Sequence, residues 1–341
     1  MAAYTTIDDP TAYFQIELYT GTGSSHARTF DSDTAMQPDL VWIKSRSGGY
    51  QHELYDAVRG VQKRVVTGGT DESAEEKSDS NSLTAFGSDG FTVGSRDQVN
   101  QGGGSAKTYV AWGWKESATA GFDIDTYTGN GTSGRTEAHS LSATPDFFVV
   151  KRTLSDGDAW RVFHKNNTTA PATDYLVFNT DGATADNAAM WNDTAPDSSN
   201  FTLGNAGSTN ENTKTFISYL FRGVQGFSKF GSYVGNGNAD GACVFLGFRP
   251  ALLIIKRTDG AKSWMMFDTK RNTGNPHGKY LVADKDDVED DSTGVYIDIL
   301  SNGFKSRVND TTSNTSGGNY IYMAWAEAPF VNSNGVPGCA R

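Results

Sequence analysis

Five short landmarks occur three times, in the same order, along the 341 residues, and this repetition constrains the fold more than any other feature. Each copy opens on a tyrosine-glycine turn and continues with a proline, an apolar run and a lysine. An amphipathic segment, a Gly-Phe or Asn-Phe turn and a strand of alternating aromatic residues follow. Because the landmarks recur about every 105 residues, we predict three tandem copies of one domain.

The landmarks can be read directly from the sequence. The opening turns are Tyr19-Thr-Gly-Thr-Gly23, Tyr127-Thr-Gly-Asn-Gly131 and Tyr233-Val-Gly-Asn-Gly237. The proline-to-lysine runs are Pro38–Lys44, Pro145–Lys151 and Pro250–Lys256, and the amphipathic segments are His52–Asp56, Trp160–His164 and Trp264–Asp268. The later turns are at Gly90-Phe91, Asn200-Phe201 and Gly303-Phe304, and the closing strands are Tyr109–Trp112, Phe216–Tyr219 and Tyr322–Trp325.

The residue pattern within each copy predicts the fold class. Aromatic and β-branched residues lie between clusters of Gly, Asn, Asp, Ser and Thr, which is typical of short strands joined by turns. The run Leu252–Ile255 is apolar on both faces, which predicts a strand in the middle of a sandwich or beneath a neighbouring copy. Phe122 and Ile124 alternate with Asp123 and Asp125, which predicts a half-exposed antiparallel strand. We therefore predict an all-β fold of three tandem β-sandwich domains, of jelly-roll or lectin-like type.

The repeats also place the domain boundaries. We predict an N-terminal extension over residues 1–12, sandwich repeats over residues 13–118, 119–224 and 225–328, and a C-terminal tail over residues 329–341. The connections between repeats are too short to act as flexible tethers, so neighbouring copies are expected to pack semi-rigidly. The two ends are expected to be ordered only against a partner.

The charge and apolar content of the chain exclude several classes of function. The chain carries 29 Lys and Arg against 40 Asp and Glu, a formal net charge of −11, without a long basic cluster, so it is not expected to bind nucleic acid. No apolar run is long enough for insertion in a membrane, and the N-terminus lacks the basic and apolar regions of a signal peptide. Cys243 and Cys339 match no metal-ligand spacing.

Patterns of catalytic residues are equally sparse. Asp123 and Asp125 are the best local carboxylate pair for a glycosidase, but no such pair recurs in all three copies, so we interpret them as a solvated strand face. No two histidines fall at metal-ligand spacing, and His164 stands where the other copies have aspartate, as an interchangeable polar residue. The glycine run 102–104 lacks the lysine of a phosphate-binding loop. We therefore predict no enzyme activity and no cofactor.

Three groups of side chains remain as candidates for ligand contact. For the lysine that ends each apolar run we favour a stem packed along apolar surface, its ammonium group reaching water or a carboxylate. For the aromatic residues we favour a place in the core, with stacking on a sugar as the alternative. An acidic run is interpreted as a solvated loop, with a Ca²⁺ site as the alternative. These candidates are Lys44, Lys151 and Lys256; Trp160, Trp264, Tyr50 and His52; and Asp284, Asp286 and Asp287.

Several of these motifs together resemble a tandem β-domain family of virion and tail-fibre proteins of tailed phages, notably marine phages. The motifs are the Tyr-Thr-Gly-x-Gly turn, Pro38–Arg46, Asp56-x-x-Arg59-Gly60, Ser88–Gly94 and Tyr109–Lys115, and the ending Ala326–Pro337 is similar as well. The resemblance covers nearly the whole chain and is closest in the first copy. The second copy departs from it at Asn167, opposite Arg59, and the third at Lys305-Ser-Arg307.

This resemblance implies a virion structural protein that assembles in the host cytoplasm. We expect a tail fibre, an appendage or another surface component that binds a host glycan or receptor. A capsid-decoration or tail-adaptor protein with a purely structural role is the alternative. The implied partners are other virion proteins and further copies of the chain, and no catalytic residues are implied.

Overall fold

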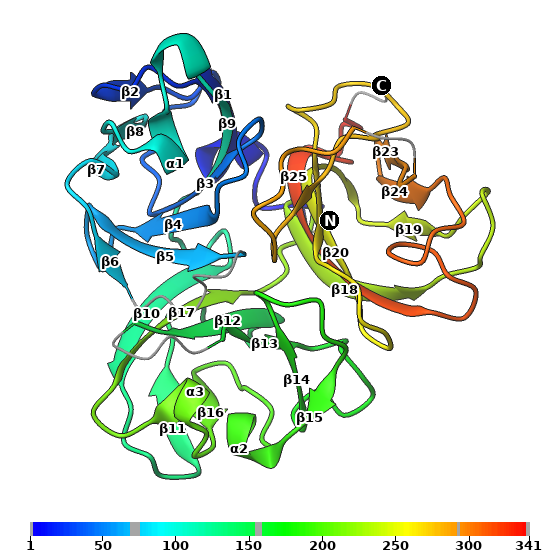
Figure 1. Cartoon of the computed structure of the whole chain (residues 1–341). Coiled ribbons are helices and arrows are strands. Elements are labelled where there is room, and N and C mark those ends of the chain that lie inside the picture. Colours follow the sequence, from blue (N-terminus) through cyan, green and yellow to red (C-terminus); the bar gives the residue numbers. More distant parts are fainter. Residues whose placement is uncertain (1–2, 69–75, 154–158, 292–293, 339–341) are drawn as a thin grey trace.

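The computed structural model describes residues 3–68, 76–153, 159–291 and 294–338. Strands dominate these residues and each helix in them is a single turn, so the predicted all-β class is confirmed. Figure 1 shows three lobes around a common centre, coloured blue, green, and yellow to red along the chain. None of the described helices is long and apolar enough to span a membrane.

Each lobe contains one large antiparallel sheet, in which the first strand pairs with the last and the last pairs with the second. The first segment has the order β1 (Phe14–Thr20), β9 (Thr108–Trp114), β3 (Leu40–Ser45), β4 (His52–Asp56), β5 (Lys63–Thr67) and β6 (Lys77–Ser78). The second has β10 (Phe122–Thr128), β17 (Thr215–Phe221), β12 (Phe147–Arg152), β13 (Arg161–His164), β14 (Asp174–Val177) and β15 (Ala185–Asp186). The third has β18 (Ser228–Val234), β25 (Asn319–Pro329), β20 (Phe248–Arg257), β21 (Met265–Asp268) and β22 (Leu281–Val282).

Each segment also contributes a small sheet, and the described helical turns all lie before the third segment. The small sheets are β2 (His26–Arg28), β8 (Gly90–Val93) and β7 (Leu83–Gly87); β11 (Arg135–Ala138) and β16 (Asn200–Leu203); and β19 (Cys243–Phe245), β24 (Gly303–Ser306) and β23 (Ile297–Leu300). The helical turns are η1 (Pro10–Ala12), α1 (Asp97–Asn100), η2 (Gly103–Ser105), α2 (Ala188–Trp191) and α3 (Gly207–Asn210).

The apolar run that follows each landmark proline forms a strand buried on both faces, as its sequence predicts. In β3, Val41 and Ile43 pack into the core of the first segment, whereas Leu40 and Trp42 face a core shared by all three segments. β12 divides its side chains in the same way. A strand whose two faces both lie in apolar surroundings has no solvated side, so the sequence shows a continuous apolar run instead of an alternation.

Three aromatic residues from equivalent strand positions meet at the centre of the shared core. Trp114 and Phe221 end β9 and β17, and Trp325 holds the equivalent register position within β25. Their ring centroids lie 5.4 Å (Trp114–Trp325), 5.3 Å (Phe221–Trp325) and 6.5 Å (Trp114–Phe221) apart. Each segment therefore supplies one ring to an axial triad, and the three lobes are bound through one apolar centre.

The predicted alignment of the third closing strand was wrong by two residues. Tyr19 pairs with Tyr109 in β1 and β9, and Tyr233 pairs with Tyr320 in β18 and β25. Tyr320, and not Tyr322, therefore stands at the place of Tyr109. An alternating pattern repeats every two residues, so a shift of two leaves the inward and outward faces unchanged and the pattern alone cannot detect it.

The described parts of the two ends pack against the third segment instead of awaiting a partner. Ile7 is 2% exposed and lies in the shared core. The Tyr4 hydroxyl donates to the main-chain oxygen of Gly247 at 3.0 Å, and the main-chain N–H of Ser333 donates to Oδ1 of Asp8 at 2.7 Å. The expectation for the ends therefore differs from the structure, because apolar Ile7 and the polar caps around it find partners within the chain.

Candidate functional site

Three equivalent main-chain hydrogen bonds join the segments to one another at their interfaces. The residue two positions after each landmark lysine accepts a main-chain N–H from the preceding segment. The bonds run from Glu76 to Thr153 at 2.7 Å, from Thr184 to Thr258 at 2.9 Å and from Glu289 to Arg46 at 2.8 Å. The third bond returns from the last segment to the first, so the segments form a closed ring.

The candidate aromatic residues lie inside these interfaces. Nε1 of Trp160 donates to Val66 O at 2.8 Å, and Nε1 of Trp264 donates to Val177 O at 2.9 Å. Both tryptophans are at most 1% exposed, so their rings bind neighbouring segments and present no face to a sugar. The favoured interpretation as core residues describes their position.

His52 occupies the same place in the first segment. Its Nδ1 accepts Nε1–H of Trp42 at 2.8 Å, so the ring proton lies on Nε2, which is 3.0 Å from Val282 O in the third segment. Burial, with the nearby Lys44, holds the pKa of His52 well below its usual value, so the ring is neutral. Tyr50 is half-buried beside it and donates to Oε1 of Gln101 at 2.7 Å.

Lys44 and Lys256 are buried within the interfaces, and for these two lysines the expectation that the ammonium group reaches water or a carboxylate was wrong. Nζ of Lys44 donates to the main-chain oxygens of Ser45, Gly48 and Asp286, at 2.9, 3.3 and 3.1 Å. An ammonium group has three donors, and three carbonyl oxygens from two segments satisfy all of them.

The other two lysines occupy the equivalent position. Nζ of Lys256 meets Arg257 O, Lys262 O and Asp181 O at 2.8, 2.7 and 3.1 Å, the last of these from the second segment. Lys151 is as buried as Lys44, and the loop after it, residues 154–158, lies outside the described residues.

Burial of Lys44 predicts a specific dependence of stability on pH. Desolvation lowers the pKa of Lys44 from 10.5 to about 7. The unfolded chain therefore binds more protons than the folded chain between pH 7 and pH 10.5, and the stability that Lys44 contributes rises across this window and is lost as the pH falls through 7. Urea unfolding at stepped pH should show this rise in the wild type and a flatter profile in Lys44→Met. Parallel profiles for the two proteins would contradict the assignment.

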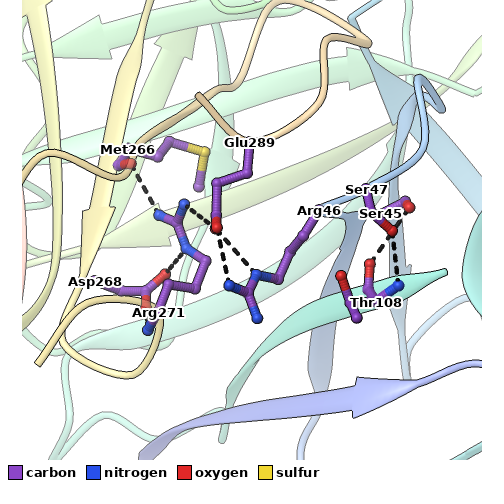
Figure 2. Close-up of polar contacts among 8 residues, drawn as sticks. All are labelled: Ser45, Arg46, Ser47, Thr108, Met266, Asp268, Arg271 and Glu289. Atoms are coloured by element: carbon purple, nitrogen blue, oxygen red, sulfur yellow. Dashed lines mark hydrogen bonds and ion pairs between the residues drawn. The ribbon is translucent and has the colours of Figure 1, made fainter. Parts of the chain in front are cut away.

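An ion-pair network closes the interface between the third and first segments (Figure 2). Glu289 accepts from Nε and Nη2 of Arg46 at 3.0 and 2.9 Å, and from Nη1 of Arg271 at 3.2 Å. The Arg271 side chain is fully buried and also donates to Asp268 and to Met266 O. Nε1 of Trp112, from the first segment, donates to Oδ2 of Asp268 at 3.2 Å. This network ties the two segments that no linker joins directly.

The same positions carry an ion pair in the first segment and neutral groups in the second. Arg59 contacts Asp56 and lies 3.3 Å from Glu76, while Tyr219 of the next segment donates to Asp56 at 2.8 Å. The second segment has His164, Asn167 and Thr184 at these three positions, and Oγ1 of Thr184 donates to Oδ1 of Asn167 at 2.6 Å. The loss of Arg at Asn167 is thus matched by the loss of Glu at Thr184. Sequence reasoning found the first change and missed the second, because neither Glu76 nor Thr184 lies in a landmark of the repeat.

His164 lies at the interface, at the place that Asp56 and Asp268 hold in the other two segments. Its Nε2 lies 3.3 Å from Tyr322 O in the third segment, the counterpart of the contacts that Asp56 and Asp268 make to their neighbours. Burial lowers the pKa of His164 to about 3, so it is a neutral residue of the interface.

The three candidate Ca²⁺ ligands, Asp284, Asp286 and Asp287, make different contacts and do not share a site. Oδ1 of Asp284 accepts the main-chain N–H of Trp264 at 2.8 Å, and Asn179 accepts that of Trp160 at 3.0 Å. In the second segment a neutral amide thus accepts the hydrogen bond that the Asp284 carboxylate accepts in the third. Asp286 offers its main-chain oxygen to Lys44, and Asp287 is exposed. Among the described residues no three His, Cys, Asp or Glu side chains form a group that could hold a metal.

A buried asparagine recurs in all three segments and was missed from the sequence. In each segment its Oδ1 accepts a main-chain N–H of the opening turn, at 2.8, 3.0 and 3.0 Å, and its Nδ2 donates to a main-chain oxygen. Its distance to the closing strand varies, because the first copy carries the extra glycines 102–104. The glycine turns are therefore pinned by a side chain, and the residues are Asn100, Asn210 and Asn314.

Asp123 is not solvated, in contrast to the sequence interpretation. It is 5% exposed and accepts the N–H and hydroxyl of Ser140, whose loop covers the strand face. Glu116, from the connection between the first and second segments, lies beside it and accepts the N–H of Ile124 at 3.3 Å. Burial and the adjacent Asp123 carboxylate raise the pKa of Glu116 to about 7.

This carboxylate pair gives a second pH prediction. Because the pKa of Glu116 rises from 4.5 in the unfolded chain to about 7 in the folded chain, its contribution to stability is complete below pH 4.5 and is lost as the pH rises to 7. Glu116→Gln should flatten the fall in unfolding free energy over this range, measured by urea titration. Asp186→Asn, at an exposed position of β15, is the control and should leave the profile unchanged. An unaltered profile in Glu116→Gln would contradict the assignment to Glu116.

The model of one protein family, described as Domain of unknown function (DUF7483), matches residues 9–329. This match covers most of the chain and all three segments, so the chain belongs to this family. No curated protein matches the chain.

Proposed function

We propose that this member of the DUF7483 family is a structural protein of a phage virion, a rigid block displayed on the particle surface as part of a tail fibre or other appendage. The observation that carries the proposal is the closed ring. Two tryptophans, one histidine and two lysines that were candidates for ligand contact bind neighbouring segments instead. These positions of the repeat thus join the segments into a rigid block, which suits a component of a particle.

In this proposal the three segments are tandem β-sandwich domains of jelly-roll or lectin-like type. The separate apolar clusters of the first and second segments support this view, because each lies between a large and a small sheet. The family model supports the ring as the working unit, since it extends across all three segments. The resemblance to virion proteins supplies the location, other virion proteins and further copies of the chain as partners, and a host glycan or receptor as the target.

The test is the particle itself. Mass spectrometry of purified phage particles should find the chain in stoichiometric amounts, and antibody labelling under the electron microscope should place it on a surface appendage. Its absence from particles would refute the proposal, whereas labelling of the capsid or the tail junction would favour a capsid-decoration or tail-adaptor role. Deletion of residues 1–12 is unsuitable as a test of attachment, because Ile7 belongs to the shared core.

A further inference from the structure

The interface between the second and third segments contains a groove of about 960 Å³. Its walls come from the loops at residues 166–169 and 183–184 on one side, and from β18 and the loop at residues 258–259 on the other. Its volume is at the upper end of the range for ligand sites. The lining is rich in amide and hydroxyl groups, and the residues that the argument uses are Asn166, Asn167, Thr184, Ser232, Val234 and Asp259.

The neutral pair of this interface leaves one buried donor unused. Asn167 is 5% exposed, and its Oδ1 accepts from Thr184. Its Nδ2 is buried in the groove wall and has no hydrogen-bond partner among the described residues. Buried polar groups are nearly always paired, so an unpaired amide in the wall of a groove indicates a partner supplied from the groove. The two other interfaces have arginine and glutamate at these positions, at 3.3 and 3.2 Å.

The charge of the groove selects among ligands. No lysine or arginine lines it, and its one carboxylate, Asp259, is already paired with Arg257 at 2.7 Å. On a chain with a net charge of −11, such a groove repels anions. Amides and hydroxyls can both donate and accept, which suits a ligand made of hydroxyl groups. Val234, which is 58% exposed, supplies apolar surface at the same place.

We infer that this groove binds a neutral oligosaccharide, with Nδ2 of Asn167 donating to a sugar hydroxyl. The inference rests on the proposed surface role and names its ligand class and location. It also explains why the second segment has Asn167 and Thr184 where the other two have arginine and glutamate. An arginine and a glutamate would pair with each other and leave no free donor in the groove wall.

The test uses the full chain on an array of neutral, sialylated and sulfated oligosaccharides, followed by calorimetry with the best-bound glycan. Neutral glycans should bind. Ser232→Trp, at an exposed position in the groove, should weaken binding at least about tenfold by filling it, as should Asn167→Arg with Thr184→Glu, which restores the ion pair of the other interfaces. Thr126→Trp is the matched control at the equivalent exposed position of β10 and should bind as the wild type does.

The side-chain amide signals of Asn167 in a nitrogen-proton correlation spectrum should also shift when the glycan is added. Binding of anionic glycans alone, no binding of any neutral glycan, or wild-type affinity in Ser232→Trp would overturn the inference. These outcomes are independent of the particle test. A chain that is present in virions but binds no sugar keeps the structural role, and a chain that binds sugar but is absent from virions keeps the groove.

Discussion

Replacing Trp325 by alanine is expected to lower the free energy of unfolding by about 3–5 kcal/mol, the usual cost of truncating a buried tryptophan. Trp325 is 3% exposed, and its ring contacts aromatic rings from all three segments: Phe14 at 6.2 Å, Trp114 at 5.4 Å, Phe221 at 5.3 Å and Phe230 at 5.6 Å. Truncation to alanine therefore leaves a cavity where the three segments meet and removes contacts between them. No segment can fill this cavity without moving relative to the other two.

The matched variant is Trp325→Phe, because Phe221 holds the equivalent place in the second segment. We expect it to cost about 1–2 kcal/mol, since the ring stays and only part of its volume is lost. Urea unfolding followed by far-ultraviolet circular dichroism measures both. If alanine costs less than about 1 kcal/mol, or if phenylalanine costs as much as alanine, the triad does not hold the segments together.

Replacing Asp268 by alanine is expected to cost a similar amount, about 3–5 kcal/mol, because it leaves the buried Arg271 guanidinium without its nearest carboxylate. Arg271 and Asp268 are both fully buried in the interface between the third and first segments. The change also removes the acceptor for Nε1 of Trp112. Glu289 remains but is shared with Arg46, so it compensates Arg271 only in part.

A double variant separates the charge from the packing. Asp268→His with Arg271→Asn copies His164 and Asn167 of the second segment and leaves no uncompensated buried charge. Its cost should stay below about 2 kcal/mol, measured by the same urea titration. A double variant as unstable as Asp268→Ala would show that the interface depends on the ion pair itself and that the three interfaces are not equivalent.

Particular residues show how far the sequence predicts this structure. The apolar runs after Pro38, Pro145 and Pro250 predict strands that are buried on both faces. The structure confirms this for all three strands. That prediction succeeds because a continuous apolar run is a local property of the chain. The placement of Tyr322 fails because its strand alternates with a period of two, and only the pairing with Tyr233 distinguishes the two registers.

The candidate site shows the same division. The sequence marks Lys44, Trp160 and Asn167 as unusual, but it does not show what they contact. Their partners Asp286, Val66 and Thr184 lie in another segment or outside the landmarks of the repeat. The groove beside Asn167 has no sequence signal at all, because its walls come from two segments and its ligand class depends on the cations that are absent from its lining.

The sequence by itself determined that the chain is all-β, that its landmarks occur three times, and where each buried strand begins, because hydrophobic period and turn chemistry act over a few residues. Only the tertiary structure decided that the three copies close into a ring. Closure depends on contacts between the first and last segments, such as the ion pair of Arg46 with Glu289. The energy of such a contact depends on how close the two groups are in space and not on their separation in the sequence. In the structure, Trp160, Trp264, His52, Lys44 and Lys256 bond to neighbouring segments, and Nδ2 of Asn167 is unpaired at the interface where we propose a ligand.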